Sequence, residues 1–305
     1  MAMKKIPYLK HGDRVALAAP ARHVSPSEMA AAIAEITSWG LEVIEPDGLY
    51  AADGQLAGND VHRASMLQHL LDDPTISAIV CARGGYGTVR IIDRLDFSGF
   101  RDVPKWIVGY SDITVLHSHI HRLCGLPTLH ATMPVNFGPE PTEASRSLRD
   151  ALFGNDLEYT WPTTEYNRRG TVAAPVVGGN LSILYSLLGS GSQIDTYGKI
   201  LLIEDLDEYL YHIDRMMQAL RRSGMLDGVA GLIVGGLTDM HDNNVPFGRT
   251  AMQIVSEAAS GLPCPVALSA PFGHLGGGNM ALRLGMEATL TVGIDASSLI
   301  LHAVQ

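Results

Sequence analysis

Short apolar segments alternate with amphipathic ones in the first half of the chain, and this alternation restricts the fold more than any other feature of the sequence. Residues 15–19 are apolar, and a capping box of Ser25 and Glu28 follows them, with Pro26 at the first helical position. Apolar residues recur at helical spacing until Gly40, after which the chain becomes apolar again. This order is a βαβ unit, so we expect two parallel strands joined by a helix.

The same criteria divide the rest of the chain into strands, helices and a central connection. Further strands are expected at residues 76–81, 106–109, 126–133, 171–177, 199–203, 229–237 and 265–270, with a closing hairpin at 280–292. Further helices are expected at 60–71, after residue 111, at 143–152, from a glycine turn at 178–180 to residue 188, at 211–220 and at 250–259. These elements predict an N-terminal α/β domain at 1–138, a linker at 139–170 and a C-terminal domain at 171–305.

Length and charge limit the classes of function. A chain of 305 residues favours two domains, and an apolar content of 46% with 18% charged residues is typical of a globular protein that folds unaided. The 32 acidic residues outnumber the 22 basic ones, and the net charge of −10 repels phosphate backbones and anionic lipid surfaces. Nucleic acid and membranes are therefore not expected partners.

The cysteines and the N-terminus both favour the cytoplasm. Cys81, Cys124 and Cys264 are few, odd in number and without metal-type spacing, which suits a reducing compartment. Lys4 and Lys5 precede no apolar stretch of the length that a signal peptide needs. We therefore expect a cytoplasmic protein.

The apolar run from Trp106 to Gly109 ends in a Gly-x-Ser sequence, and Ser111 is the candidate nucleophile. A strand that enters a sharp turn before a helix exposes a serine hydroxyl at the helix N-terminus, where unpaired N–H groups can stabilise an oxyanion. A complete nucleophile elbow has a second glycine, and Ile113 stands in its place. On these residues alone, a helix cap is the simpler interpretation of Ser111.

Residues 83–87 form a glycine-rich loop directly after an expected strand. A dinucleotide loop is one interpretation, but the third glycine and the acidic ribose ligand are missing. A tight turn is the plain alternative. In the third interpretation Gly84 or Gly85 directs its N–H at Ser111, because neighbouring parallel strands end at the same edge of a sheet, where open α/β sheets bind ligands.

Glu204 and His274 are the other candidates for chemistry. A serine nucleophile needs a base, and the base needs a carboxylate that fixes its tautomer. His274 lies beside a glycine in a loop after a buried strand, and Glu204 follows five apolar strand positions, although a solvated or helix-capping carboxylate would look the same. His117 and His121 share a helix face but lack a third ligand, so we expect no metal and no cofactor.

Four segments of the chain resemble, in family order, the LD-carboxypeptidase family of serine peptidases. This family includes muropeptide LD-carboxypeptidases and microcin C self-immunity peptidases. The segments are residues 79–87, residues 107–114, residues 202–205 with 211–216, and Gly273-His274. One departure is Arg283, which stands where the family often has proline, in a region that could help to shape the substrate pocket.

The resemblance implies a Ser-Glu-His triad in which Ser111 is the nucleophile, His274 the general base and acid, and Glu204 the residue that orients His274. It implies an oxyanion hole formed by the backbone N–H groups of Gly85 and Asp112. It also implies a flavodoxin-like parallel-sheet N-terminal domain, a smaller mixed β/α C-terminal domain, and a homodimer.

The implied substrate is a peptide, and the implied reaction hydrolyses an amide between an L-configured centre and a C-terminal D-amino acid. Release of D-Ala from murein tetrapeptide during peptidoglycan recycling is such a reaction. We expect Arg83, with Gly84 beside it, to bind the free carboxylate of the leaving residue. The alternative enzyme is an immunity peptidase that cleaves an acyl-adenylate peptide mimic. The alternative without catalysis is a two-domain small-molecule binder in which Ser111 caps a helix.

Overall fold

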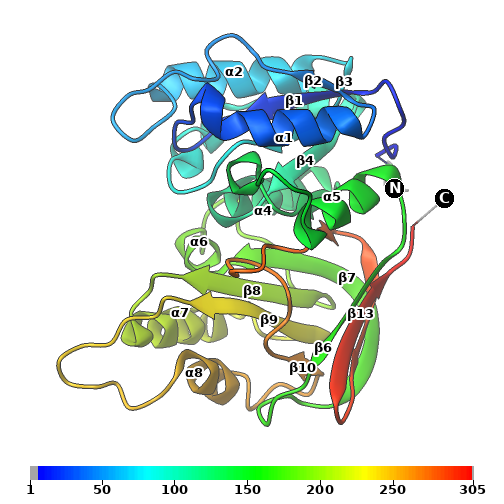
Figure 1. Cartoon of the computed structure of the whole chain (residues 1–305). Coiled ribbons are helices and arrows are strands. Elements are labelled where there is room, and N and C mark those ends of the chain that lie inside the picture. The colour runs from blue at the N-terminus through cyan, green and yellow to red at the C-terminus, as the bar shows by residue number, and fades with distance from the viewer. Residues whose placement is uncertain (1–5, 304–305) are drawn as a thin grey trace.

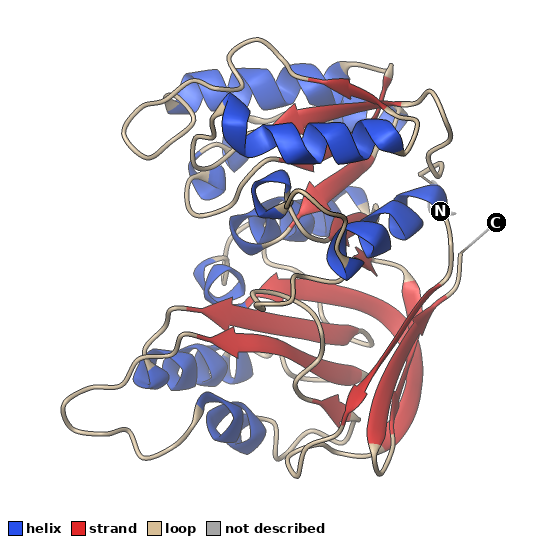
Figure 2. Ribbon diagram, in the orientation of Figure 1, coloured by secondary structure: helices blue, strands red, loops and turns tan. Residues whose placement is uncertain are grey.

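The computed structural model describes residues 6–303, and Figure 1 shows two β-sheets, one in the upper and one in the lower half of the molecule, with helix α5 (Glu143–Phe153) between them. Figure 2 shows helices packed around the upper sheet and further helices below the lower one. None of the helices within the described residues is both long enough and apolar enough to cross a lipid bilayer. The expectation for Lys4 and Lys5 falls outside the described residues.

The first sheet has six strands in the order β11-β5-β4-β3-β1-β2. Its strands are β1 (Arg14–Ala18), β2 (Glu42–Ile44), β3 (Ile76–Cys81), β4 (Trp106–Gly109), β5 (Thr128–His130) and β11 (Leu282–Leu284). Its α-helices, besides α5, are α1 (Pro26–Ser38), α2 (Asp60–Asp72), α3 (Ser98–Asp102) and α4 (Thr114–Cys124). Strands β1 to β5 are parallel in the order 2-1-3-4-5 that is typical of flavodoxin-like folds, which confirms the predicted fold of the first half.

The second sheet has seven strands in the order β10-β9-β8-β7-β12-β13-β6 and is mixed, as predicted. Its strands are β6 (Leu157–Pro162), β7 (Gly170–Asn180), β8 (Ile200–Leu206), β9 (Gly231–Thr238), β10 (Val266–Ala267), β12 (Glu287–Val292) and β13 (Ala296–Leu301). Its helices are α6 (Leu181–Ser186), α7 (Leu210–Arg222) and α8 (Ala251–Ala258). Strands β7 to β10 are parallel, and the pairs β7–β12, β12–β13 and β13–β6 are antiparallel.

The predicted hairpin at 280–292 is wrong, because its two strands belong to different sheets. Strand β11 runs antiparallel to β5 in the first sheet, and β12 pairs with β13 and β7 in the second. Gly285 separates them with a φ of +83°, a conformation that glycine adopts without strain. Strand β6, which lies in the predicted linker at 139–170, joins the edge of the second sheet. The two halves of the chain are therefore joined by strands as well as by a connection.

The predicted glycine turn at 178–180 is also wrong, because these residues continue β7 and pair with β8. A Cβ atom on Gly178 would lie 2.0 Å from the carbonyl oxygen of Leu202. The glycine is needed for the close approach of the two strands rather than for a change of direction. The helix that follows, α6, ends at Ser186.

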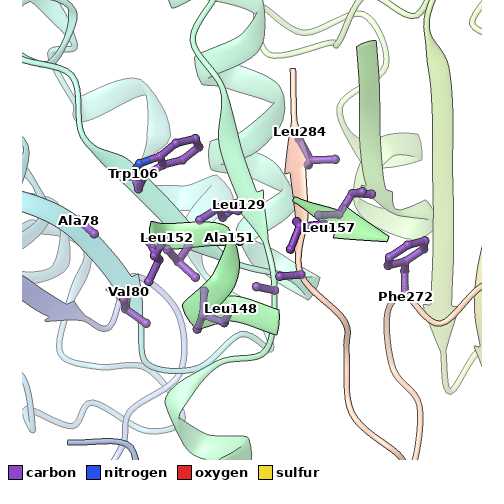
Figure 3. Packing of buried hydrophobic residues seen from close by; sticks show 14 of the residues in the cluster. Ala78, Val80, Trp106, Leu129, Leu148, Ala151, Leu152, Leu157, Phe272 and Leu284 are labelled. Atoms are coloured by element: carbon purple, nitrogen blue, oxygen red, sulfur yellow. The ribbon is translucent and has the colours of Figure 1, made fainter. Parts of the chain in front are cut away.

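A continuous apolar core connects the two sheets. Figure 3 shows side chains of α5, among them Leu148 and Leu152, close to Val80 and Trp106 of the first sheet. The same cluster of buried side chains extends to Phe272 beside the second sheet. Because packed interiors leave few voids, this shared core holds residues from both sheets in a defined relative position.

Candidate active site

Ser111 lies in a sharp turn at the carboxyl end of β4, in the first sheet. It opens the 3₁₀ helix η3 (Ser111–Ile113), which runs directly into α4. Its φ of +63° is in the left-handed region, where a residue with a Cβ atom is strained by about 1–3 kcal/mol. Ser111 is the first residue of η3 rather than its cap, and no capping side chain is present at η3 or α4. This geometry is that of a nucleophile turn and does not support the helix-cap interpretation.

The glycine loop after β3 lies against this turn. A Cβ atom on Gly84 would lie 3.0 Å from the Ser111 Cβ and 3.1 Å from its Oγ, so the loop passes closer to the serine than most side chains would allow. The next residue, Gly85, has a φ of +105°. Of the three interpretations of this loop, the structure favours the one that places it beside Ser111.

Glu204 of β8 and His274, in the loop between β10 and β11, meet beside the same turn. The His274 Nδ1 lies 2.6 Å from Glu204 Oε2, and the backbone N–H of His274 donates to the same oxygen at 3.2 Å. The His274 ring is 4.7 Å from the ring of Tyr110, which precedes Ser111. Within residues 6–303 no hydrogen bond joins His274 to Ser111, and catalytic hydrogen bonds of this kind often tighten only when substrate is bound.

Glu204 is more deeply placed than its sequence position suggested. It lies inside β8 rather than beyond its end, and the side chain is fully buried. Gly273 packs directly on it: with a φ of +93°, a Cβ atom there would lie 2.5 Å from Glu204 Oε2. Glycine before His274 therefore allows the carboxylate and the imidazole to meet.

The pKa values of this pair are shifted in opposite directions. Burial opposes protonation of His274, but the hydrogen bond to Glu204 and the charges of Glu204 and Asp205 outweigh it and raise the pKa of His274 above its ordinary 6.5. Burial alone would raise the pKa of Glu204, but the facing His130 and His274 side chains lower it. Glu204 is therefore ionised and can orient the His274 tautomer.

These shifts predict the pH dependence of the reaction. A general base must be neutral, so kcat/KM should fall as the pH decreases through the raised pKa of His274, and the acid limb should lie above pH 6.5. The measurement is the pH profile of kcat/KM, with Glu204→Gln as the control that should move the limb to lower pH. An acid limb below pH 6.5 in the unmodified protein would contradict this assignment.

The remaining predicted site residues lie around the same turn. Asp112 is buried, its Oδ2 accepts the N–H of Thr88 at 2.9 Å, and burial raises the pKa of the carboxyl group. The Asp112 carboxylate is thus occupied by the residue that follows the glycine loop. Arg83 is half-exposed and forms an ion pair with Glu28 at 3.0 Å.

Arg283 stands where the family often has proline, and its side chain lies between β11 and the end of α5. It is fully buried in β11, and its guanidinium donates to the carbonyl oxygens of Asp150, Ala151 and Asn155 around the C-terminus of α5. Cations stabilise helix C-termini, where carbonyl groups lack partners. Arg283 therefore ties β11 to α5.

His117 and His121 do not form the metal pair considered for them. The ring of His117 hydrogen-bonds the Gly109 carbonyl at 2.9 Å, and that of His121 lies 3.2 Å from the Thr128 hydroxyl. The described part of the chain holds no cluster of three or more His, Cys, Asp or Glu side chains suited to a metal ion.

Sequence reasoning missed His130 and Asn279, which complete the surroundings of Glu204. His130 is fully buried at the end of β5, 3.9 Å from Glu204, and Asn279 lies between it and the His274 loop. The available signal was the position of His130 at the end of a strand next to β4, because parallel neighbours end at one edge of the sheet. Nothing in the sequence pointed to Asn279.

A strained serine, a glycine loop against it and a carboxylate-bound histidine from the other sheet are the parts from which serine hydrolases are built. Comparison with protein families identifies the family of serine hydrolases to which these parts belong. Residues 15–131 match the LD-carboxypeptidase N-terminal domain, and residues 173–290 match the LD-carboxypeptidase C-terminal domain. The chain belongs to the LD-carboxypeptidase family and is a serine peptidase, as the resemblance of its motifs implied.

Individual relatives agree with this assignment. The chain is 39% identical to a probable murein peptide carboxypeptidase of Bacillus subtilis over 79% of this chain and 76% of that protein. It is 28% identical to the murein tetrapeptide carboxypeptidase of Pseudomonas aeruginosa over 91% and 92% of the two chains.

Two solved structures share the fold. The muramoyltetrapeptide carboxypeptidase from Oxalobacter formigenes has a TM-score of 0.86 and 26% identity, over 95% of this chain and 98% of that one. The microcin C7 self-immunity protein MccF, in complex with aspartyl sulfamoyl adenosine, has a TM-score of 0.84 and 20% identity, over 99% and 100%. At that identity the second likeness concerns the fold alone.

Proposed function

We propose that this protein hydrolyses the L,D-amide bond of murein tetrapeptide and releases the terminal D-Ala, a step of peptidoglycan recycling. The observation that carries the proposal is the Glu204–His274 pair beside the strained Ser111 turn. The names of the relatives from Bacillus subtilis and Pseudomonas aeruginosa supply the substrate class.

In the proposed mechanism the Ser111 Oγ attacks the amide carbon while His274 Nε2 takes the hydroxyl proton. The backbone N–H groups of Gly85 and Asp112 stabilise the oxyanion of the tetrahedral intermediate. His274 then gives its proton to the amine of D-Ala, which leaves, and an acyl-enzyme ester on Ser111 remains. Water, deprotonated by His274, cleaves the ester and restores Ser111. Glu204 stays ionised and stabilises the imidazolium at each step.

The test is incubation with purified murein tetrapeptide, followed by mass spectrometry. We expect loss of one alanine and appearance of tripeptide. A tetrapeptide that ends in L-Ala is the matched control, which should remain intact. An unchanged tetrapeptide after prolonged incubation with folded protein would overturn the proposal.

The immunity-type reaction remains the second candidate because the fold is shared with MccF. The greater identity to a murein peptide carboxypeptidase favours the first. An aminoacyl sulfamoyl adenosine assayed in parallel distinguishes them, since hydrolysis of that compound without hydrolysis of tetrapeptide would establish the second.

We propose that Arg83 binds the free carboxylate of the leaving D-Ala. Its ion pair with Glu28 is half-exposed, and such pairs contribute only about 0–1 kcal/mol, so exchange of Glu28 for a substrate carboxylate costs little. Arg83→Ala should raise KM for tetrapeptide by about 10- to 100-fold, the loss expected for one hydrogen bond to a charged group. KM for the C-terminal amide of the same peptide should not change.

Glu28→Gln is the matched control for Arg83→Ala, because it frees the guanidinium and should leave KM unchanged or lower. An unchanged KM for tetrapeptide in Arg83→Ala would remove Arg83 from the site. Arg22 would then be tested in the same way, since its exposed side chain packs against Gly85.

We further propose a cytoplasmic homodimer. Cys81 and Cys264 are buried as free thiols and Cys124 is free as well, which suits a reducing compartment. The dimer is implied by family resemblance, and sedimentation equilibrium at micromolar concentration would test it.

A further inference from the structure

The second oxygen of the Glu204 carboxylate faces a histidine from the other sheet. Glu204 Oε1 lies 3.9 Å from His130 Nε2, and both residues are fully buried. Neither atom has a hydrogen-bond partner within residues 6–303. Buried polar atoms without partners are rare because each costs about 1–3 kcal/mol, so two that face each other require an explanation.

The surroundings of His130 fix which of its nitrogens carries the proton. The backbone N–H of Gly273 donates to Asn279 Oδ1 at 2.7 Å, which sets the orientation of the Asn279 amide. The Asn279 Nδ2 then faces His130 Nδ1 at 3.4 Å as a donor, so Nδ1 must accept. The tautomer that fits these contacts has its proton on Nε2, the nitrogen that faces Glu204.

Two other rings lie beside His130. The ring of Tyr110 meets it edge-on at 5.9 Å, and the ring of His117 lies 6.4 Å away with its Nε2 bound to the Gly109 carbonyl. The carboxylate oxygen that faces His130 Nε2 is Glu204 Oε1, at 3.9 Å.

We propose that His130 is a positioning residue that holds the second oxygen of Glu204, so that the first oxygen stays aligned with His274. This inference rests on the proposed function only for its peptide substrate. At 3.9 Å the contact is longer than a hydrogen bond, and we expect it to shorten to one when the peptide binds, as catalytic hydrogen bonds often do.

The proposal also gives a function to β11, the strand at which the chain returns from the second sheet to the first. His130 ends β5 and pairs in register with Leu282 of β11, three residues after Asn279. The segment that carries His274 therefore returns to the first sheet beside the histidine that contacts Glu204. Polar contacts thus lead from Gly273 through Asn279 to His130 at 2.7 and 3.4 Å, and from His130 to Glu204 at 3.9 Å.

Three variants test the proposal. His130→Phe fills the space but removes both nitrogens, and His130→Gln returns one N–H donor. His119→Phe is the matched control, because His119 is also a buried histidine but bonds the Ser192 hydroxyl. The measurements are kcat and KM on tetrapeptide, the rate of Ser111 labelling by a fluorophosphonate, and the thermal midpoint.

His130→Phe should lower kcat and the labelling rate by about 10- to 100-fold, as for loss of one hydrogen bond to a charged group, and should leave KM within about twofold. His130→Gln should recover most of the loss, and His119→Phe should show none. Wild-type kcat and labelling in a folded His130→Phe, or no recovery in a folded His130→Gln, would overturn the proposal.

A variant at Asn279 tests the proposal if His130→Phe does not fold. Asn279→Leu is similar in volume but has no amide, so nothing donates to His130 Nδ1 and the histidine proton is no longer held on Nε2, facing Glu204. It should show the same loss of labelling, and wild-type labelling would again overturn the proposal. Because labelling needs no peptide, it reports on His130 even if tetrapeptide is not the substrate, so the two proposals fail independently.

Discussion

Ser111→Ala should remove hydrolysis of tetrapeptide almost completely, with a fall in kcat of about 10⁶-fold, the loss measured when a triad serine is deleted in another hydrolase. The reason is chemical, because the proposed nucleophile is the Ser111 hydroxyl, whose Oγ lies 3.1 Å from the Cβ position of Gly84, and alanine has no hydroxyl. KM should change little, since the glycine loop and the peptide-binding surface stay in place. The measurement is release of D-Ala in a coupled assay sensitive enough to detect residual turnover.

Two observations separate loss of the nucleophile from loss of the fold. Ser111→Ala keeps the Cβ atom and the left-handed φ, so its thermal midpoint should stay within a few degrees of wild type. A fluorophosphonate should label the unmodified protein at one serine and leave Ser111→Ala unlabelled. Ser98→Ala, at an exposed serine of α3, should keep full activity. Substantial turnover in folded Ser111→Ala would show that another group is the nucleophile.

The parts of the fold that follow from local sequence were predictable. The capping box at Ser25 begins α1 as the sequence indicated, and the alternation of strands and helices up to β5 gives the parallel sheet. Each of these elements is determined by residues within one turn or one strand.

The features that depend on distant partners were not predictable. Strand β11 pairs with β5, about 150 residues earlier in the chain, and a three-residue apolar segment carries no sign of which sheet it will join. Gly178 looks like a turn glycine until Leu202 is found against it. His130 is one of twelve histidines, and Asn279, the residue that fixes its tautomer, arrives on a segment from the other sheet.

The site depends on the same distant contacts. Ser111 follows a strand of the first sheet, Glu204 lies in the second, and His274 lies in the loop that runs from the second sheet back to the first. The apolar core through α5 and the pairing of β11 with β5 connect the two halves that carry these residues. If the proposed triad acts as inferred, this connection is what positions its members for acyl transfer.

Glu204→Gln should lower kcat by about 10⁴-fold, the loss found when the carboxylate of another serine triad is changed to an amide. Glu204 faces donors on both oxygens: the side chain and backbone N–H of His274 on Oε2, and the ring of His130 at Oε1. An amide has one oxygen, so its NH₂ group must face one of these donors. Either His274 changes its tautomer and ceases to be a base, or the contact with His130 becomes repulsive.

Two roles are possible for Glu204: it orients His274, or it only packs against the loop of His274. The size of the kcat loss in Glu204→Gln, and whether that loss adds to the loss in Ser111→Ala, distinguishes these roles. Gln fills the same volume, so Glu204→Gln should remain folded while it loses both turnover and fluorophosphonate labelling. The double variant Ser111→Ala/Glu204→Gln should be no less active than Ser111→Ala alone, because triad residues act as a unit and their losses do not add. A loss below about tenfold in Glu204→Gln, or additive losses in the double variant, would mean that Glu204 supports the loop of His274 without directing its proton.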